Sequence, residues 1–136
     1  MSFDTVYAGI VGRLNALGYA ESSDVTDFKN ASSEEYGNTF ILKCVSGEMG
    51  LENKSNGFDD AQEWQVRIAF KRNDQSEVIA LQETHRKKDA ILADLDNPVR
   101  WESFVKMLKY KSWTVIETPN YFILDVRLHV LDTYTY

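Results

Sequence analysis

The sequence predicts an α+β fold of two layers, with a mostly antiparallel sheet and helices packed on one of its faces. Residues 120–134 alternate between apolar and polar side chains, which is typical of a long strand with one buried face. Two other stretches repeat apolar side chains every three or four residues, which is typical of helices. The predicted strands also follow one another closely along the chain, and strands joined by hairpins pair antiparallel.

Length and composition are those of an ordinary globular protein. The 136 residues are expected to form one domain, 1–136, that buries a core without disulfides or metal ions. The lone Cys44 cannot form an internal disulfide. The first residues lack the basic start and the unbroken apolar run of a signal peptide, and no stretch approaches the ~20 apolar residues of a membrane span. We therefore expect an intracellular protein that does not contact a membrane.

The charge is negative and unevenly distributed. The formal net charge is −6, and residues 1–66 contain 4 Lys or Arg against 11 Asp or Glu, whereas residues 67–136 contain 11 against 10. A protein that binds nucleic acid usually carries a basic excess on one face. We therefore expect no stable binding to DNA, which an acidic surface would repel.

The first predicted element is a helix that Ser2 can cap and that Gly18 ends. Gly9 and Gly12 lower the helix propensity inside it, so we expect them to mark close packing against a neighbouring element. Its predicted apolar stripe consists of Phe3, Tyr7, Ile10, Leu14 and Leu17.

Two strands are expected next, at residues 39–45 and 63–72, with a long loop at 46–60 between them. In the first strand, Phe40, Leu42 and Cys44 are expected to point inward. The loop is predicted because residues 46–60 contain three glycines and two asparagines and show no periodicity. Loops of this length are usually functional or disordered. The inward side of the second strand is expected to carry Trp64, Val66, Ile68 and Phe70.

A second helix is predicted from Asn73 or Asp74 to about Asp96, where Pro98 ends it. Its stripe is apolar at both ends and polar in the middle, with Val78, Leu81, His85, Lys88, Leu92 and Leu95. A short helix within 99–111 would follow, with Trp101, Phe104, Val105 and Leu108 along one side.

The chain is expected to finish with a strand at 112–118, a turn at Pro119 and the long closing strand. Phe122, Leu124, Val126, Leu128 and Val130 fall on one face of that closing strand. The other face carries Tyr121, Asp125, Arg127 and His129, with Ile123 and Leu131 among them.

Two sets of residues are candidates for a catalytic or metal site. Asp59, Asp60 and Glu63 could bind a hard cation or act as acid and base, but the spacing of a calcium loop is absent. His85 and Asp89 share a helical face, a pairing that helix surfaces produce constantly. We therefore expect no catalytic site, no metal site and no cofactor.

Two further features have an alternative to a purely structural interpretation. Cys44 could act as a nucleophile only beside an activating base, which the sequence does not place there. Residues 85–88, HRKK, form either a solvated helical surface or a basic face, including Arg86 and Lys87, that meets an acidic surface of another copy.

Four stretches of the chain resemble one known family. They are DAQEWQVRIAFKR (60–72), DQSEVIALQETHRKKDAILADL (74–95), WESFVKMLKYKSWTVIET (101–118) and NYFILDVRLHVLDTYTY (120–136). In length and hydrophobic pattern they resemble the tail terminator, or tail completion, proteins of long-tailed bacteriophages, the lambda-like minor tail protein U family. The first 60 residues are similar to this family in arrangement rather than in residue identity.

The resemblance implies an α+β subunit of a hexameric ring that caps the phage tail tube, ends its polymerisation and offers a surface to the head. Its partners would be other copies of itself, the tail tube protein and head–tail connector proteins, while DNA passes through without specific binding. It would be assembled in the host cytoplasm and lie in the virion, at the head-proximal end of the tail. No enzymatic activity is implied.

From the residues themselves, we expect the contacts with sister subunits or with the tube at the long loop, the second helix and the closing strand. Alternatives are a head–tail connector or neck subunit, a small metal-dependent hydrolase built on Asp59, Asp60 and Glu63, and a monomeric regulatory binding module. The expected contact residues are Met49, Leu51, Phe58, Arg86, Lys87, Arg127 and His129.

Overall fold

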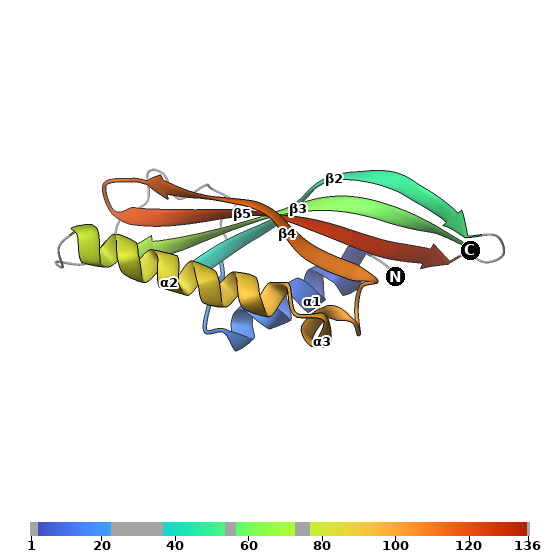
Figure 1. Cartoon of the computed structure of the whole chain (residues 1–136), viewed down its shortest axis with the longest axis horizontal. Coiled ribbons are helices and arrows are strands. Elements are labelled where there is room, and N and C mark those ends of the chain that lie inside the picture. The colour runs from blue at the N-terminus through green and yellow to red at the C-terminus, as the bar shows by residue number, and fades with distance from the viewer. Residues whose placement is uncertain (1–2, 23–36, 54–56, 73–76, 136) are drawn as a thin grey trace.

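The computed structural model describes residues 3–22, 37–53, 57–72 and 77–135, and for 49–53, 57–58 and 133–135 it describes the backbone alone. Figure 1 shows the described helices below a strongly twisted sheet. The order helix, strands, helix, short helix, strands is the one that the sequence predicts. The elements are α1 (Phe3–Ala16), β1 (Ala20–Glu21), β2 (Thr39–Asn53), β3 (Gly57–Lys71), α2 (Glu77–Leu95), α3 (Pro98–Trp101), β4 (Met107–Glu117) and β5 (Tyr121–Thr135).

The sheet has the strand order β1-β2-β3-β5-β4. Only β1 and β2 run parallel, and every other neighbouring pair is antiparallel. The pairing of β3 with β5 is the longest and runs without a break from Gly57 opposite Thr135 to Lys71 opposite Tyr121. With the helices packed against this sheet, the predicted class is confirmed: α+β, with a mostly antiparallel sheet.

Helix α1 packs on the sheet through Val6, Ile10 and Leu14, which are fully buried. Phe3, which the predicted stripe included, is instead half exposed and stacks on Trp64 with 5.4 Å between ring centroids. A helix has 3.6 residues per turn, so spacings of three and four allow more than one stripe, and the sheet selected the one that contains Val6.

The glycines of the first helix have three different roles. A Cβ atom on Gly9 would lie 2.3 Å from the ring of Phe104, so the predicted close packing is confirmed there. Nothing lies within 4 Å of a Cβ on Gly12, so that prediction is wrong. Gly18 has a φ of 98°, and the amide of Tyr19 donates to the carbonyl of Leu14. This is the Schellman motif that ends helices at a glycine, as predicted.

The closing strand β5 confirms the predicted alternation, because Phe122, Leu124, Val126, Leu128 and Val130 are all buried, the last four in the main core. Its other face changes character along its length. Tyr121 and Ile123 are fully buried in a second apolar cluster with Ile41 and Ala69, whereas His129 is exposed. The face opposite the helices is thus apolar at one end and polar at the other.

The predicted long loop at 46–60 is wrong. Strand β2 continues to Asn53 and β3 begins at Gly57, so most of the segment is strand. Its glycines and asparagines disfavour a strand locally, but β3 also pairs along its whole length with β5, and this pairing outweighs the local preference. Register shifts in β2 between Cys44 and Ser46 and between Met49 and Glu52 accommodate the irregular sequence as bulges.

The predicted short helix within 99–111 is wrong after its first turn. Helix α3 ends at Trp101, and β4 begins at Met107 because this segment pairs with β5, with Leu108 opposite Val130. The predicted burial is nevertheless confirmed, since Trp101, Phe104, Val105 and Leu108 all belong to the main core.

The start of α2 predicted at Asn73 or Asp74 lies outside the described residues, and its end at Leu95 agrees with the prediction. Val78 of the predicted stripe is 65% exposed, whereas Thr84 is buried. The Thr84 hydroxyl donates to the carbonyl of Ala80 at 2.9 Å, so its hydrogen bond is satisfied inside the protein. Because threonine is polar, the hydrophobic pattern of the sequence could not predict that this residue is buried. None of the helices in the described ranges is long and apolar enough to cross a membrane.

Strands β2, β3 and β5 run past the helices at one end of the sheet (Figure 1). Ser46 pairs there with Glu63, and Glu63 with His129. We call residues 46–53, 57–63 and 129–135 the sheet extension. The remainder of the sheet, which lies over the helices, is the covered half.

Candidate interaction surface

A row of charged side chains crosses β3, β5 and β4 on the face opposite the helices. Side chains alternate along a strand, and Trp64, Val66 and Ile68 point toward the helices, so their neighbours in β3 point away from them. We call the row the charged array. It consists of Arg67, Asp125, Arg127, Glu63 and Lys111.

The charged array is linked by an unbroken series of short contacts. Arg67 Nε donates to Asp125 Oδ2 at 2.9 Å, and Gln65 donates to the same oxygen at 2.8 Å. Arg127 bridges the two acids, with 3.6 Å from its Nε to Asp125 Oδ1 and 3.4 Å from its Nη1 to Glu63 Oε2. Lys111 Nζ completes the series at 2.8 Å from Glu63 Oε1. Ion pairs at a solvent-exposed sheet surface contribute little net stability, so the array orders side chains more than it stabilises the fold.

The charges around Glu63 favour its ionised form. The hydrogen bond from Lys111 lowers the pKa of the Glu63 carboxyl, and the charges of Lys111, Arg127 and His129 act in the same direction. Glu63 therefore carries a negative charge across the ordinary pH range and keeps both cations in place.

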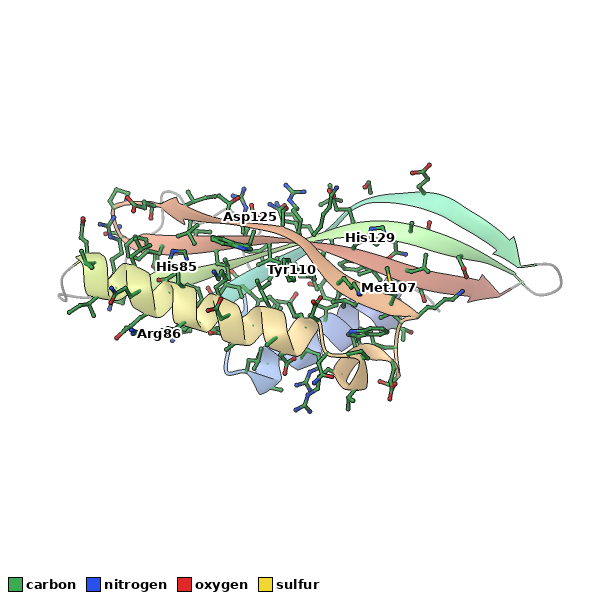
Figure 2. All side chains as sticks on the ribbon, viewed as in Figure 1. His85, Arg86, Met107, Tyr110, Asp125 and His129 are labelled. Carbon is green, nitrogen blue, oxygen red and sulfur yellow. The ribbon has the colours of Figure 1, made fainter. Side chains whose placement is uncertain are left out.

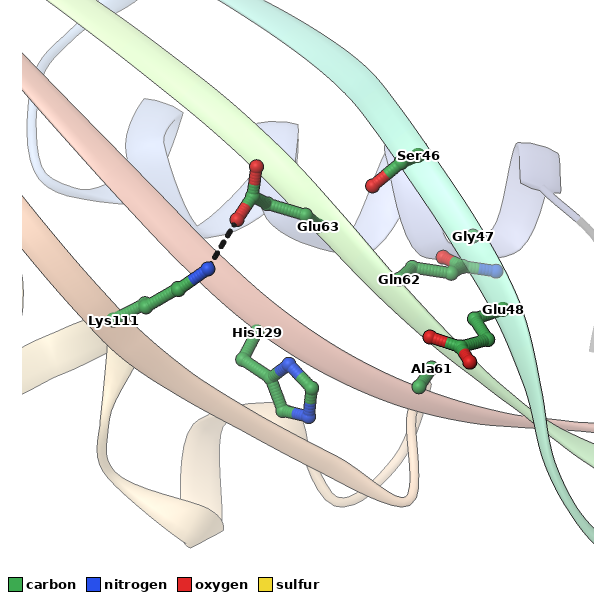
Figure 3. Close-up of a pocket in the computed structure, with 8 residues that line it drawn as sticks. All are labelled: Ser46, Gly47, Glu48, Ala61, Gln62, Glu63, Lys111 and His129. Atoms are coloured by element: carbon green, nitrogen blue, oxygen red, sulfur yellow. Dashed lines mark hydrogen bonds and ion pairs between the residues drawn. The ribbon is translucent and has the colours of Figure 1, made fainter.

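An open groove of about 290 Å³ lies beside this end of the array. In Figure 3 Glu63 and Lys111 form their ion pair, with His129 and Glu48 on the strands nearby. The groove is lined by side chains from β2, β3, β4 and β5: Ser46, Gly47, Glu48, Ala61, Gln62, Glu63, Lys111 and His129. Because it spans four strands, a partner seated there would touch the whole width of the sheet.

The structure distributes the predicted contact residues over more than one surface. Arg127 and His129 lie at or beside the charged array, on the face that the sequence predicted for them. Arg86 is exposed on the side of α2 that faces away from the sheet (Figure 2). Lys87 Nζ instead lies 5.2 Å from the centre of the Phe70 ring.

The remaining three predicted contacts are the apolar residues of the segment 46–60, which was predicted to be a loop and is mostly strand. Met49 belongs to β2, opposite Asp60, and Phe58 belongs to β3, opposite Tyr134. Leu51 lies in β2 at the second bulge. Their side chains lie outside the described part of the structure, so their role as contacts stays a prediction.

The three acids proposed for a hydrolase have three different partners. Asp59 is buried and accepts a hydrogen bond from Lys106 at 2.8 Å, Asp60 accepts one from Gln62 at 2.8 Å, and Glu63 belongs to the charged array. Consecutive strand residues point to opposite faces, which separates Asp59 from Asp60. Among the described residues, no group of three His, Cys, Asp or Glu side chains could hold a metal ion.

The polar middle of α2 has a packing role. Lys88 is buried, and its Nζ lies 3.8 Å from the centre of the Trp113 ring and 3.3 Å from a carboxylate oxygen of Asp89. The imidazole of His85 meets the edge of the same ring at a centroid distance of 5.6 Å. The cation and the imidazole thus attach α2 to strand β4.

Cys44 lies opposite Trp64, on the predicted side of β2, but it is exposed rather than buried in the core. It is exposed because it stands at a bulge in β2, where β3 is its only neighbouring strand in the described part of the sheet. Partial burial, followed by the charge of Asp60, raises the pKa of its thiol. A raised pKa keeps the thiol protonated and less nucleophilic.

Sequence reasoning found Arg127 and His129 but missed their partners. Alternation does place Arg67 and Asp125 on outward positions of their strands, which is a usable signal. Their contact requires the register of β3 with β5, however, which the sequence does not specify. Lys111 was assigned to a helix, so its position in a strand beside Glu63 could not be seen.

Comparison with known proteins adds no relative. No family model matches the sequence, and no curated protein matches it at a significant level. The functional interpretation therefore depends on the fold, the charged array and the resemblance in residue pattern.

Proposed function

We propose that this protein is a structural subunit of a bacteriophage tail. Its copies would form a ring, with six as the expected number, that caps the tail tube, ends tube polymerisation and offers a surface to which the head joins. The proposal rests on the resemblance of residues 60–136 to tail terminator proteins and on the α+β arrangement of helix, strands, helix, short helix and strands that the family shares.

The single observation that carries the proposal is the charged array on the uncovered face of the sheet. Its side chains are held by one another at 2.8–3.6 Å, so they present a fixed pattern of charge. Fixed complementary charge speeds association and excludes wrong partners more than it adds affinity. An assembly that must add one component in one orientation needs that property.

Ring closure has a physical consequence for the subunit. A head-to-tail contact uses two different surfaces of each copy, and it produces a ring if the rotation closes and a filament if it does not. The net charge of −6 also suits a channel through which DNA slides without binding.

Electron microscopy of the purified protein, alone and after addition to isolated phage tail tubes, tests the proposal. We expect rings seated at one end of the tubes, and tubes that no longer elongate when tube protein is added. Tubes that elongate normally in a saturating amount of this protein would contradict a terminator. Mixing it separately with isolated tails and isolated heads distinguishes a connector, which would bind heads first.

A pair of charge-reversal variants locates the contact surface. We expect Arg127→Glu to reduce binding to tubes at least tenfold, because it places a third acid between Asp125 and Glu63. Arg86→Glu makes the same charge change on the other side of the molecule, on α2. If only Arg86→Glu weakens binding, the contact lies on the helix rather than on the charged array.

A double variant, Met49→Ser with Phe58→Ser, tests the segment 46–60. These two apolar residues lie in strands of the sheet extension. We expect weaker binding to tubes with an unchanged far-ultraviolet circular dichroism spectrum. Unchanged ring formation and unchanged tube binding would remove both residues from the contact surface.

A further inference from the structure

In the described part of the chain, both edges of the sheet are open to another strand over several residues. On one side, β1 pairs only with Thr39 and Phe40, and no strand in the described part of the chain pairs with β2 beyond them. On the other side, β4 is the last strand. The Tyr110 amide donates to the Asp96 side chain at 3.0 Å, so this amide is not open to another strand. A strand added at this edge can pair its backbone with the residues after Tyr110, whereas Lys109 and Tyr110 can contribute side-chain contacts.

The strand directions favour pairing between these two edges. From β2 to β4 the strands β2, β3, β5 and β4 alternate in direction, so β2 and β4 run antiparallel to each other. If β4 of one copy lies beside β2 of the next, the alternation continues and the helices of both copies stay on the same side. Open edges expose unpaired backbone groups, and a closed ring of such contacts would cover both edges of every copy.

One register matches the two edges residue by residue. When Glu48 of one copy lies opposite Lys109 of the other, the residues that follow share a face in every row, once the bulged Val45 and Lys111 are skipped. The matched rows after this charge pair are Gly47 with Tyr110, Ser46 with Ser112, Cys44 with Trp113, Lys43 with Thr114, Leu42 with Val115 and Ile41 with Ile116.

The side chains in this register are complementary in charge and in size. Glu48 and Lys109 are both exposed and have opposite charges. Tyr110 and Trp113, which are 42% and 39% exposed in a single copy, would lie over Gly47 and Cys44. An aromatic ring beside a glycine on a neighbouring strand restores side-chain contact that the glycine lacks.

We propose that copies of this protein associate by antiparallel pairing of β4 in one copy with β2 in the next, in the register that sets Lys109 opposite Glu48. The inference deepens the proposed function, on which it rests, since it names the contact through which the ring would close. The occupant of each edge is a second copy of this chain.

Disulfide trapping tests the register directly. In a Cys44→Ser background, Lys43→Cys and Thr114→Cys replace two exposed residues that lie opposite each other in the proposed contact. Facing residues on antiparallel strands have Cα atoms about 4.5–5.5 Å apart, which a disulfide can bridge. Within one copy the two residues lie on β2 and β4, with β3 and β5 between them, roughly 14 Å apart at about 4.8 Å per strand. Any disulfide between them must therefore join two chains.

Oxidation of the concentrated double variant with oxidised glutathione should give a ladder of linked chains in non-reducing gel electrophoresis. The matched control pairs Lys43→Cys with Glu117→Cys, which lies three residues further along β4 and about 10 Å out of register. We expect at least tenfold less linkage in the control. Equal linkage in both pairs, or none in either, overturns the proposal. A dimer formed by Thr114→Cys alone would show a two-fold contact between β4 strands and would overturn it as well.

Charge exchange gives a second measurement that does not depend on a disulfide. Glu48→Lys and Lys109→Glu each place like charges opposite each other and should weaken self-association, measured by sedimentation, by at least tenfold. The two changes together restore an opposite pair and should recover it. No recovery in the double variant overturns the register.

The same experiments separate this inference from the proposed function. If linked ladders form but no rings appear on tubes, the strand pairing is supported and the proposed function as a tail terminator is refuted. If rings form on tubes but Lys43→Cys and Thr114→Cys do not link, the proposed function is supported and the strand pairing is refuted.

Discussion

The covered half of the sheet and the sheet extension share the same strands and the same pairing, but their inward positions differ. In the covered half these positions carry buried apolar residues such as Leu42, Ile68 and Leu124. In the extension Val130 still belongs to the main core, but the position opposite it in β3 carries Gln62, whose Nε2 donates to Asp60 at 2.8 Å and whose Oε1 accepts from the Trp64 indole at 2.7 Å. Trp64 marks the boundary between the two regions. Its ring belongs to the apolar core, and its indole N–H donates the first of the two hydrogen bonds that lead through Gln62 to Asp60.

The difference shows two ways of holding one sheet together. The covered half depends on apolar area removed from water, which involves no titrating group. The extension depends on hydrogen bonds and ion pairs, each of which contributes little net free energy to folding. Removing one partner of such a pair costs more, because the other polar group is then left without a hydrogen bond. We therefore expect the extension to open at a lower free energy than the covered half.

The largest effect is expected in the covered half. Ile68→Ala should lower the free energy of unfolding by about 2–5 kcal/mol, because it leaves a cavity in the main core. Val45→Ala, at the edge of the extension and 46% exposed, should change it by less than about 0.5 kcal/mol. Urea titration followed by circular dichroism measures both, and similar losses in the two variants would refute the division.

The next effect concerns the contact between α1 and the segment after α3. Gly9→Ala should destabilise the protein by about 1–3 kcal/mol, since its methyl group would meet the buried ring of Phe104. Gly12→Ala is the matched control in the same helix, with open space around the new methyl group, and should stabilise by up to about 1 kcal/mol. Thermal unfolding separates the two, and a loss in both would mean that the helix itself tolerates no change.

A smaller effect is expected within the extension. Lys106→Met removes one partner of the buried Asp59 carboxylate and should cost about 1 kcal/mol, because the lysine itself is half exposed. Hydrogen exchange should become faster in residues 57–63 and 129–135 and stay unchanged in the covered half. Uniformly faster exchange would mean that the two regions unfold as one unit.

The smallest effect is a pH dependence at the charged array. Because the pKa of Glu63 is lowered, its contribution to stability is present above the ordinary glutamate pKa of about 4.3 and is lost as the pH falls through the lowered value. Glu63→Gln should therefore melt slightly earlier than the wild type at neutral pH, and the difference should shrink as the pH falls below the ordinary glutamate pKa and through the lowered value. A difference that persists in acid would assign the effect to packing rather than to charge.

The candidate surface was only partly predictable. The alternation in β5 is sufficient to place Arg127 and His129 on the face opposite the helices, as the structure has them. Arg127 contacts Glu63, which lies 64 residues away, and Glu63 contacts Lys111, 48 residues further along the chain. Contacts over such separations depend on register and on a bulge in β4. Neither leaves a periodic signal in the sequence.

The sequence by itself determined the fold class, the order of the elements, the Schellman end of α1 at Gly18 and the buried face of β5, because each follows from periodicity or from the backbone freedom of one residue. Only the tertiary structure decided that residues 46–53 and 57–60 are strand and that β4 starts at Met107. Residues 57–60 and the start of β4 pair with β5, through backbone hydrogen bonds that local preference does not anticipate because they join residues far apart in the chain. Residues 46–53 in turn pair with β3.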